Sequence, residues 1–273
     1  LQDRQASICL DGKLSSCKPV HNGVPQGSPV SGILSAFYST GLIEYMQGRR
    51  EARQEHVRER EGNPTFIAPT LFLYVDDGRI TVHSDDLKLN TRELGNAFGV
   101  VREWFNGAGL QPDLDKCELM HHTWRRRDPS FEEMEQDDSL AMTYYNAQNQ
   151  LVRLRPLRVV RWLGIFFDSK LTFRAHVDKA CGKARKAAMA LRMLGNTVRG
   201  LHQGHMRRLY IACIRPILIY ASAVWWMQMA WQVQQLSRVQ NLCLRLICAV
   251  FKTSPIYALE IEAAIPPISK VLD

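Results

Sequence analysis

Two apolar, β-prone runs, residues 71–75 and 79–82, flank the adjacent carboxylates of Asp76 and Asp77, which Gly78 follows. This pattern predicts a β-hairpin with Asp76 and Asp77 at its turn. Two adjacent carboxylates repel each other unless a cation lies between them, and Mg²⁺ takes oxygen ligands while leaving room for substrate phosphates. The hairpin is therefore a candidate metal site, although an Asp-Gly turn between two strands needs no metal.

Upstream of this hairpin, apolar residues at helical spacing predict a helix over residues 32–46, with Ser28 or Ser31 as its N-cap. The charged residues 47–64 can extend this helix through pairs of opposite charge before a turn. At the start of the chain, two β-prone runs around Asp11-Gly12 predict a second hairpin.

Downstream of the carboxylates, Ser84-Asp85-Asp86 is typical of a turn or cap, and Thr91 is the predicted N-cap of a helix that ends at Asn106-Gly107. A turn then leads to a strand that we expect to begin at about Lys116. The polar, turn-rich residues 124–150 are expected to form a surface insertion.

The last part of the chain combines a short hairpin with helices. Two β-prone runs in residues 159–168 are hinged at Gly164, which lets another backbone approach closely. From residue 174 onward the pattern is mostly helical, with an apolar stripe on one face of the first helix. Lys179, Lys183 and Lys186 share another face of that helix at spacings of four and three.

Composition and charge narrow the possible partners. With 273 residues, 46% of them hydrophobic, the chain can bury a core. Residues 174–273 carry 14 Lys and Arg against 4 Asp and Glu, whereas residues 1–173 carry 21 against 23. A basic tail on a near-neutral body predicts binding to a polyanion such as nucleic acid, the alternative being a merely solvated basic face. The most apolar run, residues 216–231, is shorter than the roughly 20 residues that cross a bilayer.

Two motifs in this order carry a resemblance to a known family. Gly23-Val24-Pro25-Gln26-Gly27-Ser28-Pro29-Val30-Ser31 and Tyr74-Val75-Asp76-Asp77 resemble the reverse transcriptases, in particular those of LINE-like (non-LTR) retrotransposons. The resemblance implies an α+β fold in which a right-hand polymerase palm, an antiparallel sheet with packed helices, is followed by an α-helical thumb. We expect the palm, partial at its N-terminal side, in residues 1–173 and the basic thumb in residues 174–273.

The resemblance also implies roles for individual residues. Asp76 and Asp77 would bind the two Mg²⁺ ions of an RNA-directed DNA polymerase, and Lys116 would neutralise or protonate the leaving pyrophosphate. A solvent-exposed loop lysine is an equal alternative for Lys116. The segment with Trp162, Leu163 and Gly164 is similar to the hairpin that grips the primer 3′ end, although Trp162 and Leu163 fit a plain core equally well.

Two further groups of residues are assigned by the same resemblance. Lys179, Lys183 and Lys186 would contact nucleic-acid phosphates in the thumb. The template and the incoming base pair would contact one set of residues around the catalytic turn: Gly23, Pro25, Gln26, Gly27, Ser28, Tyr74 and Val75.

The expected partners are an RNA template, a DNA primer duplex and deoxynucleoside triphosphates, with no membrane. Seven scattered cysteines without a Cys-x-x-Cys pair favour reduced thiols inside the cell, and the resemblance implies the nucleus at the site of integration. Viral RNA polymerases typically carry Gly-Asp-Asp where this chain has Val75-Asp76-Asp77, and group II intron maturases usually have alanine at the position of Val75. A non-catalytic RNA-binding relic of a reverse transcriptase remains the alternative from another class.

The family resembled here needs a third carboxylate from a strand that precedes the Pro25–Ser28 loop. Asp3 lies in a polar run and Asp11 lies in a hairpin turn, so neither fits that strand. The chain also begins without methionine, which suggests a piece of something longer. We therefore expect the third carboxylate upstream of Leu1 and expect no polymerisation by residues 1–273 alone.

Overall fold

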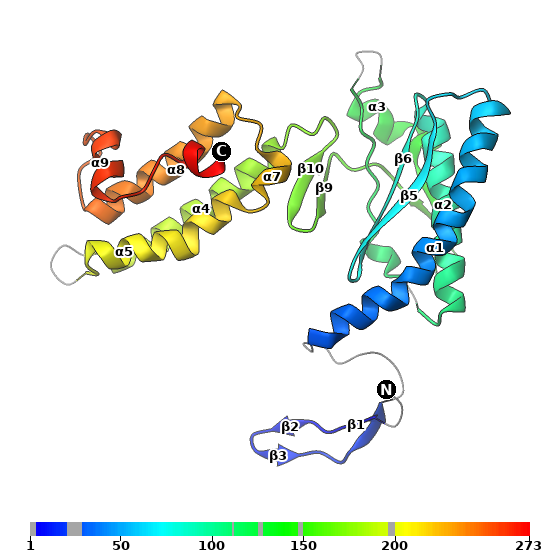
Figure 1. The fold of residues 1–273 in the computed structure, drawn as a ribbon, viewed down its shortest axis with the longest axis horizontal. Helices are drawn as coiled ribbons and strands as arrows, with labels where there is room; N and C mark the ends of the chain where they lie inside the picture. Colours follow the sequence, from blue (N-terminus) through cyan, green and yellow to red (C-terminus); the bar gives the residue numbers. More distant parts are fainter. Residues whose placement is uncertain (1–3, 21–28, 111, 125–127, 147–149, 196–199) are drawn as a thin grey trace. The chain divides into compact units, whose positions relative to one another are not determined.

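The computed structural model describes residues 4–20, 29–110, 112–124, 128–146, 150–195 and 200–273 (Figure 1). The chain divides into two compact units, and each includes a segment taken from the middle of the other's sequence. Unit 1 comprises residues Leu1–Cys117 and Asp138–Leu154, and unit 2 comprises Glu118–Asp137 and Arg155–Asp273. Every described sheet consists of two antiparallel strands, so the mixture of helices and strands agrees with the predicted α+β class.

Unit 1 contains the elements of the first half of the chain in sequence order. These are β1 (Arg4–Ala6), β2 (Cys9–Leu10), β3 (Lys13–Leu14), β4 (Lys18–Val20), α1 (Pro29–Glu59), β5 (Ile67–Tyr74), β6 (Asp77–His83), α2 (Leu87–Gly107), the 3₁₀ helices η1 (Leu114–Lys116) and η2 (Asp138–Leu140), β7 (Met142–Tyr145) and β8 (Leu151–Leu154). The predicted N-terminal hairpin is confirmed, with Asp11 and Gly12 at its turn and Leu10 opposite Lys13.

Helix α1 is longer than the predicted 32–46, because the charged segment continues it to Glu59. Ser31 lies inside α1 and is not its N-cap, while Ser28 lies outside the described residues. The start of α2 also differs from the prediction. The Asp86 carboxylate accepts hydrogen bonds from the backbone N–H of Lys88 at 2.8 Å and of Leu89 at 3.3 Å, so Asp86 is the N-cap.

One face of the β5–β6 hairpin packs against α1 and α2, as Figure 1 shows. Leu71 and Leu73 point into this core, whereas Phe72 and Tyr74 alternate with them and are 49% and 62% exposed. The core residues of this layer are Leu42, Met46, Ala97 and Val101, with Ile80 and Trp104 packed against them. The alternation therefore places Phe72 and Tyr74 on the other face of the hairpin, together with Asp77 and Arg79, which lie opposite them on β6.

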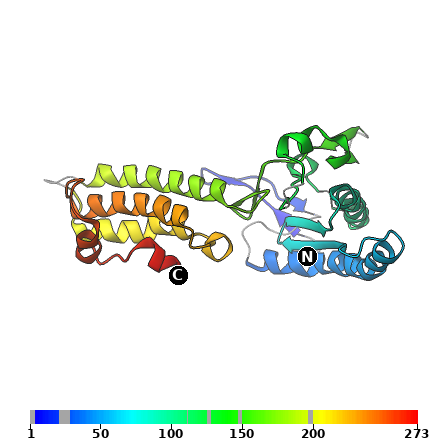
Figure 2. The same ribbon diagram turned by 90° about the horizontal axis from the view of Figure 1, so that it is seen from above.

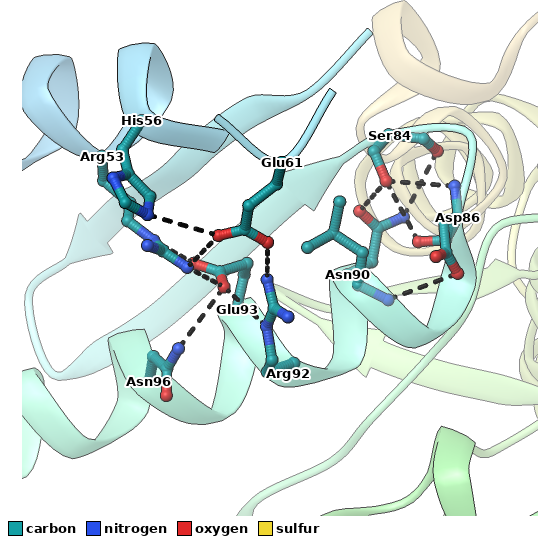
Figure 3. Close-up of polar contacts among 10 residues, drawn as sticks. Arg53, His56, Glu61, Ser84, Asp86, Asn90, Arg92, Glu93 and Asn96 are labelled. Carbon is teal, nitrogen blue, oxygen red and sulfur yellow. Dashed lines mark hydrogen bonds and ion pairs between the residues drawn. The ribbon is translucent and has the colours of Figure 1, made fainter. Parts of the chain in front are cut away.

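An ion-pair network around the buried Glu93 joins α1 to α2 (Figure 3). The Glu93 side chain is 1% exposed, and it accepts hydrogen bonds from Arg53 Nη2 at 2.6 Å and Arg53 Nε at 2.9 Å. Arg92 Nε donates to the same carboxylate at 3.1 Å, and Glu61 pairs with both arginines. Burial acts to raise the pKa of Glu93, but the arginines outweigh it, and the pKa lies below its usual value.

Unit 2 contains α3 (Phe131–Gln136), β9 (Val159–Trp162), β10 (Ile165–Asp168) and a set of helices. These helices are α4 (Arg174–Leu194), α5 (Gln203–Leu209), the π-helical turn η3 (Tyr210–Ile214), α6 (Arg215–Ile219), α7 (Ser222–Trp225), α8 (Ala230–Cys248), α9 (Ile256–Glu262) and α10 (Ile268–Leu272). The helices α4 and α8 run side by side (Figure 2), and they bury an apolar core that includes Val177, Leu236 and Trp225. The predicted helical tail is thus confirmed.

One described stretch, Gln203–Trp225, is long and apolar enough to cross a bilayer. Tyr210, Ile214, Leu218 and Trp225 from this stretch are fully buried in the core of unit 2. A core helix of a globular domain has the same length and hydropathy, so these two properties alone do not indicate a membrane span.

Two further predictions about local structure were wrong. Residues Leu114–Lys116 form the 3₁₀ helix η1 where a strand was expected to begin, and Leu119 makes an isolated parallel bridge with Pro156. Residues 124–150 are more than a surface insertion, because Met134, Leu140 and Met142 are buried. The apolar side chains of residues 124–150 are spaced too irregularly for sequence periodicity to predict this burial.

Candidate functional site

The two adjacent carboxylates lie at the end of the β5–β6 hairpin, as the sequence predicts, but only one of them is in the turn. Tyr74 pairs with Asp77, so the two-residue turn consists of Val75 and Asp76, and Asp77 is the first residue of β6. Both carboxylates are exposed. Because side chains alternate along a strand, Asp77 shares the open face of the hairpin with Tyr74.

The backbone of the turn is strained at Val75. Its φ is 57°, and Asp76 does not share this conformation. A positive φ at the first of two turn residues is typical of a tight type II′ hairpin, where glycine is preferred. A β-branched residue in this region costs on the order of 1–2 kcal/mol. The hairpin thus holds Asp76 in a sharp turn that a sequence without glycine at position 75 does not favour.

The donor atoms at this turn suit a hard divalent cation. Two neighbouring carboxylates offer oxygen ligands of the type that Mg²⁺ takes. Within the described part of the chain, however, no group of three or more His, Cys, Asp or Glu side chains is arranged to hold a metal ion. Asp76 and Asp77 therefore fit part of a metal site, and the described residues do not complete it.

Lys116 belongs to the same unit and responds to the charge of Asp76. Its Nζ lies 2.6 Å from Oδ2 of Asp113, which is the N-cap residue of η1 and precedes Lys116 by three residues. The hydrogen bond and the charge of Asp113 raise the pKa of Lys116, and the negative charge of Asp76 adds to this effect. Lys116 is largely exposed and holds its proton firmly, which suits a cation beside a phosphate.

The predicted substrate loop cannot be compared with this turn. Gly23, Pro25, Gln26, Gly27 and Ser28 lie outside the described residues, and the description resumes at Pro29, the first residue of α1. The expected proximity of the loop to Asp76 stays a prediction. Tyr74 and Val75, the other predicted substrate contacts, are both exposed next to Asp76.

The hairpin predicted to grip a primer is formed by β9 and β10 in unit 2. Trp162 pairs with Ile165, and the turn consists of Leu163 and Gly164 with φ of 47° and 82°. Trp162 and Leu163 are half-buried, and the Trp162 ring lies 6.5 Å from that of Phe167. Each of these side chains thus has a packed part and a solvent-exposed part, and the primer-grip role stays a prediction.

Tyr220, at the end of α6, fixes the turn of this hairpin. Its hydroxyl donates a hydrogen bond to the Leu163 carbonyl at 2.9 Å. A Cβ atom on Gly164 would lie 3.1 Å from a Tyr220 ring carbon and 3.3 Å from its hydroxyl oxygen. Glycine at position 164 thus allows the positive φ and leaves room for the close approach of Tyr220.

The three predicted phosphate contacts lie on the exposed side of α4. Lys179, Lys183 and Lys186 are exposed, while Val177 and Ala184 point into the core. No ion pair joins any of these lysines to a carboxylate among the residues that the structure describes. Lys179 Nζ lies 3.8 Å from the centroid of the Phe166 ring, so the basic face of α4 adjoins β10.

Comparison with known proteins gives one informative match. The chain is 23% identical over 225 residues to the RNA-directed DNA polymerase from the mobile element jockey of Drosophila melanogaster. The chain is a distant relative of that polymerase. The match covers 82% of this chain and 22% of the relative, so the chain spans about a fifth of the length of the curated relative it matches. No family model matches the chain. No solved structure matches it.

This relationship to a reverse transcriptase agrees with the family that the two sequence motifs indicate. Sequence reasoning missed Asp113 and Tyr220, which contact Lys116 and the Leu163–Gly164 turn. Asp113 stands three residues before Lys116, a spacing that could have indicated the pair. Tyr220 stands 57 residues from Leu163, and no local pattern reveals that contact.

Proposed function

We propose that residues 1–273 are the palm and thumb portion of a LINE-like reverse transcriptase that extends a primer on an RNA template. The observation that carries the proposal is the strained Tyr74-Val75-Asp76-Asp77 turn, which presents two exposed carboxylates at the end of a hairpin packed on two helices. The distant relationship to the jockey polymerase supports it. In this proposal the palm covers residues 1–173 and the thumb residues 174–273.

In the proposed reaction, the primer 3′-hydroxyl attacks the α-phosphate of a deoxynucleoside triphosphate. A new bond joins the 3′-oxygen to this phosphorus, the bond from the phosphorus to the pyrophosphate oxygen breaks, and the hydroxyl proton passes to solvent. Asp76 and Asp77 would hold two Mg²⁺ ions, which lower the pKa of the hydroxyl and neutralise the developing charge. Lys116 would exchange its Asp113 partner for the pyrophosphate, and loss of Asp113 removes the main cause of its raised pKa. Lys116 would then give the pyrophosphate a proton or a balancing charge.

A third carboxylate is part of the proposal and is assigned to sequence outside residues 1–273. The described residues offer only two carboxylates at the turn, and Asp11 lies in the turn of the separate β2–β3 hairpin. Among the described residues β5 and β6 pair only with each other, so the outer edge of β6 beside Asp77 can take a further strand that carries this carboxylate.

Primer extension tests the proposal. The assay uses an RNA template, a DNA primer, Mg²⁺ and four deoxynucleotides, and compares residues 1–273 with the longer reading frame that contains them. We expect extension by the longer protein only, and a loss of about 10³-fold or more on Asp76→Asn. Asp11→Asn is the matched control, because it makes the same change in another hairpin turn and should leave extension intact. Extension by residues 1–273 alone, or by the Asp76→Asn protein, would contradict the proposal.

The basic face of α4 provides a second test. Changing Lys179, Lys183 and Lys186 to glutamine should weaken binding to an RNA–DNA duplex and reduce the slope of log affinity against log salt by about 2 to 3. The control is a triple change of the other exposed lysines of unit 2, Lys170, Lys252 and Lys270. An equal loss in both triple variants would mean that the α4 face is merely solvated.

The dependence of triphosphate binding on Mg²⁺ separates a polymerase from a non-catalytic relic. A relic that only binds RNA should be indifferent to Mg²⁺ and to the charges of Asp76 and Asp77. We expect instead that Mg²⁺ strengthens binding of the triphosphate to the longer protein on its primed template, and that Asp76→Asn removes this effect. An unchanged response to Mg²⁺ in the variant would favour the relic.

A further inference from the structure

A cavity of about 410 Å³ lies between α1, β5 and α2, all within unit 1. Part of its wall is aliphatic, from Met46, Pro69, Ala97 and Val100. Another part is cationic, because α1 contributes three arginines and a histidine: Arg49, Arg50, Arg53 and His56. Glu93 and Asn96 of α2 also line the cavity. Its volume is within the range of sites that bind small ligands or side chains of a partner.

The cationic wall keeps a net positive charge after its internal ion pairs are counted. Arg53 is neutralised by Glu93 and Glu61, as Figure 3 shows. Arg49 donates to the Tyr45 hydroxyl at 2.6 Å and stacks on its ring, so its partner carries no charge. Among the residues that the structure describes, the Arg50 guanidinium makes neither a hydrogen bond nor an ion pair. Two guanidinium groups therefore face the cavity without a carboxylate.

Helix α1 presents positive side chains to the cavity. Arg49, Arg53 and His56 follow the helical repeat along the cavity and form a positive stripe, whereas Glu51, Glu55 and Arg58 lie on another face and do not line it. A merely solvated helix gains most from mixing opposite charges at spacings of three and four. The arrangement instead leaves the positive stripe directed at the cavity.

The lining also distinguishes between classes of ligand. The cavity lining contains no Phe, Tyr or Trp side chain on which a nucleic-acid base could stack. Its imidazole, His56, lies 3.7 Å from a Glu61 carboxylate oxygen. An aliphatic floor beside unpaired arginines fits an apolar side chain flanked by carboxylates. We propose that this cavity docks an acidic peptide segment, with one apolar side chain on the aliphatic floor and its carboxylates beside Arg49 and Arg50. The proposal does not depend on polymerase activity.

Fluorescence anisotropy with a labelled peptide tests this proposal on the full chain of 273 residues. The probe carries two glutamates on each side of a single leucine, and a second probe has glycine in place of the leucine. We expect binding of the leucine peptide, about tenfold weaker binding to the Arg50→Glu protein, and little binding of the glycine peptide. The matched control is Arg60→Glu, which reverses one exposed charge just beyond α1 and outside the cavity.

A second variant blocks the cavity without changing charge. Ala52 lines it and is exposed, so Ala52→Trp should fill it and abolish peptide binding while circular dichroism shows unchanged helix content. Absence of binding by the leucine peptide, or equal weakening by Arg50→Glu and Arg60→Glu, would overturn the proposal. So would binding of a ten-nucleotide oligouridylate that depends on Arg50, because the cavity would then be a nucleic-acid site.

Discussion

Replacement of Glu93 by glutamine should loosen the packing of α1 against α2 without changing the shape of the side chain. The carboxylate accepts three arginine hydrogen bonds, from 2.6 to 3.1 Å, and its side chain is 1% exposed. Charge-assisted bonds are worth about 1.5–3 kcal/mol each, but desolvation of the carboxylate offsets several kcal/mol of that sum. Arg53 and Arg92, whose side chains are 33% and 52% exposed, can regain water. The net loss should be about 3 kcal/mol, at the low end for a broken buried ion pair.

Hydrogen exchange measured by mass spectrometry can isolate this loss in α2. Because 1.4 kcal/mol corresponds to a factor of ten, the slowest α2 amides should exchange about 100-fold faster in Glu93→Gln at pH 7. The matched control is Glu61→Gln, which should have a much smaller effect because its side chain is 30% exposed. Equal effects of the two changes, or a change of less than about fivefold at Glu93, would refute the reasoning.

The same pair of proteins gives a pH test with a defined sign. The folded-state pKa of Glu93 lies below its ordinary value of 4.5, because the arginines outweigh burial. The stabilisation is therefore complete above pH 4.5 and is lost as the pH falls through the folded-state pKa. The difference in exchange between wild type and Glu93→Gln should narrow over that interval. A difference that stays constant to lower pH would show that the carboxylate charge is not its source.

Three other predictions concern single contacts. Tyr220→Phe removes the hydrogen bond to Leu163 but keeps the ring, so β10 amides should exchange about fivefold faster, and unchanged exchange would mean that the bond is not stabilising. The buried His176 accepts a hydrogen bond from the Phe166 N–H, and burial lowers its pKa, so unfolding should become easier as the pH falls below 6.5. In His176→Phe the denaturation midpoint should therefore fall less steeply as the pH is lowered. An identical pH dependence in the two proteins would show that His176 is not its source. Val75→Gly relieves the positive φ and should stabilise folding by about 0.5–1 kcal/mol in thermal denaturation, whereas a loss would show that Val75 is unstrained.

Local chemistry explains which elements the sequence predicts well. The β5–β6 hairpin follows from β-prone runs and a polar turn, and the basic face of α4 follows from helical spacing alone. The start of α2 was harder to predict from the sequence, because both Asp86 and Thr91 are good N-cap residues. Asp86 caps the helix, and the Thr91 hydroxyl instead donates to the Leu87 carbonyl inside it.

Contacts between distant residues explain what the sequence does not predict. Residues 47–64 contain only a run of mixed charges, yet Arg53 finds Glu93 at a separation of 40 residues. The cavity beside this pair arises where α1, β5 and α2 meet, so no one of these segments reveals it. The strand expected at Lys116 fails for a local reason, because Asp113 closes a 3₁₀ turn by accepting the Lys116 N–H at 3.2 Å.

The interleaving of the two units has a consequence for the order of events during synthesis. Asp138–Leu154 belongs to unit 1, although the chain has by then entered unit 2 at Glu118. The ring of Tyr144, from this late segment, packs against Phe98 with centroids 5.5 Å apart. As the chain leaves the ribosome, α2 must therefore wait with part of its apolar surface in water until β7 emerges. A truncation that ends between residues 118 and 154 leaves unit 1 without all or part of Asp138–Leu154 and keeps only a piece of unit 2, so soluble fragments should begin or end outside this interval.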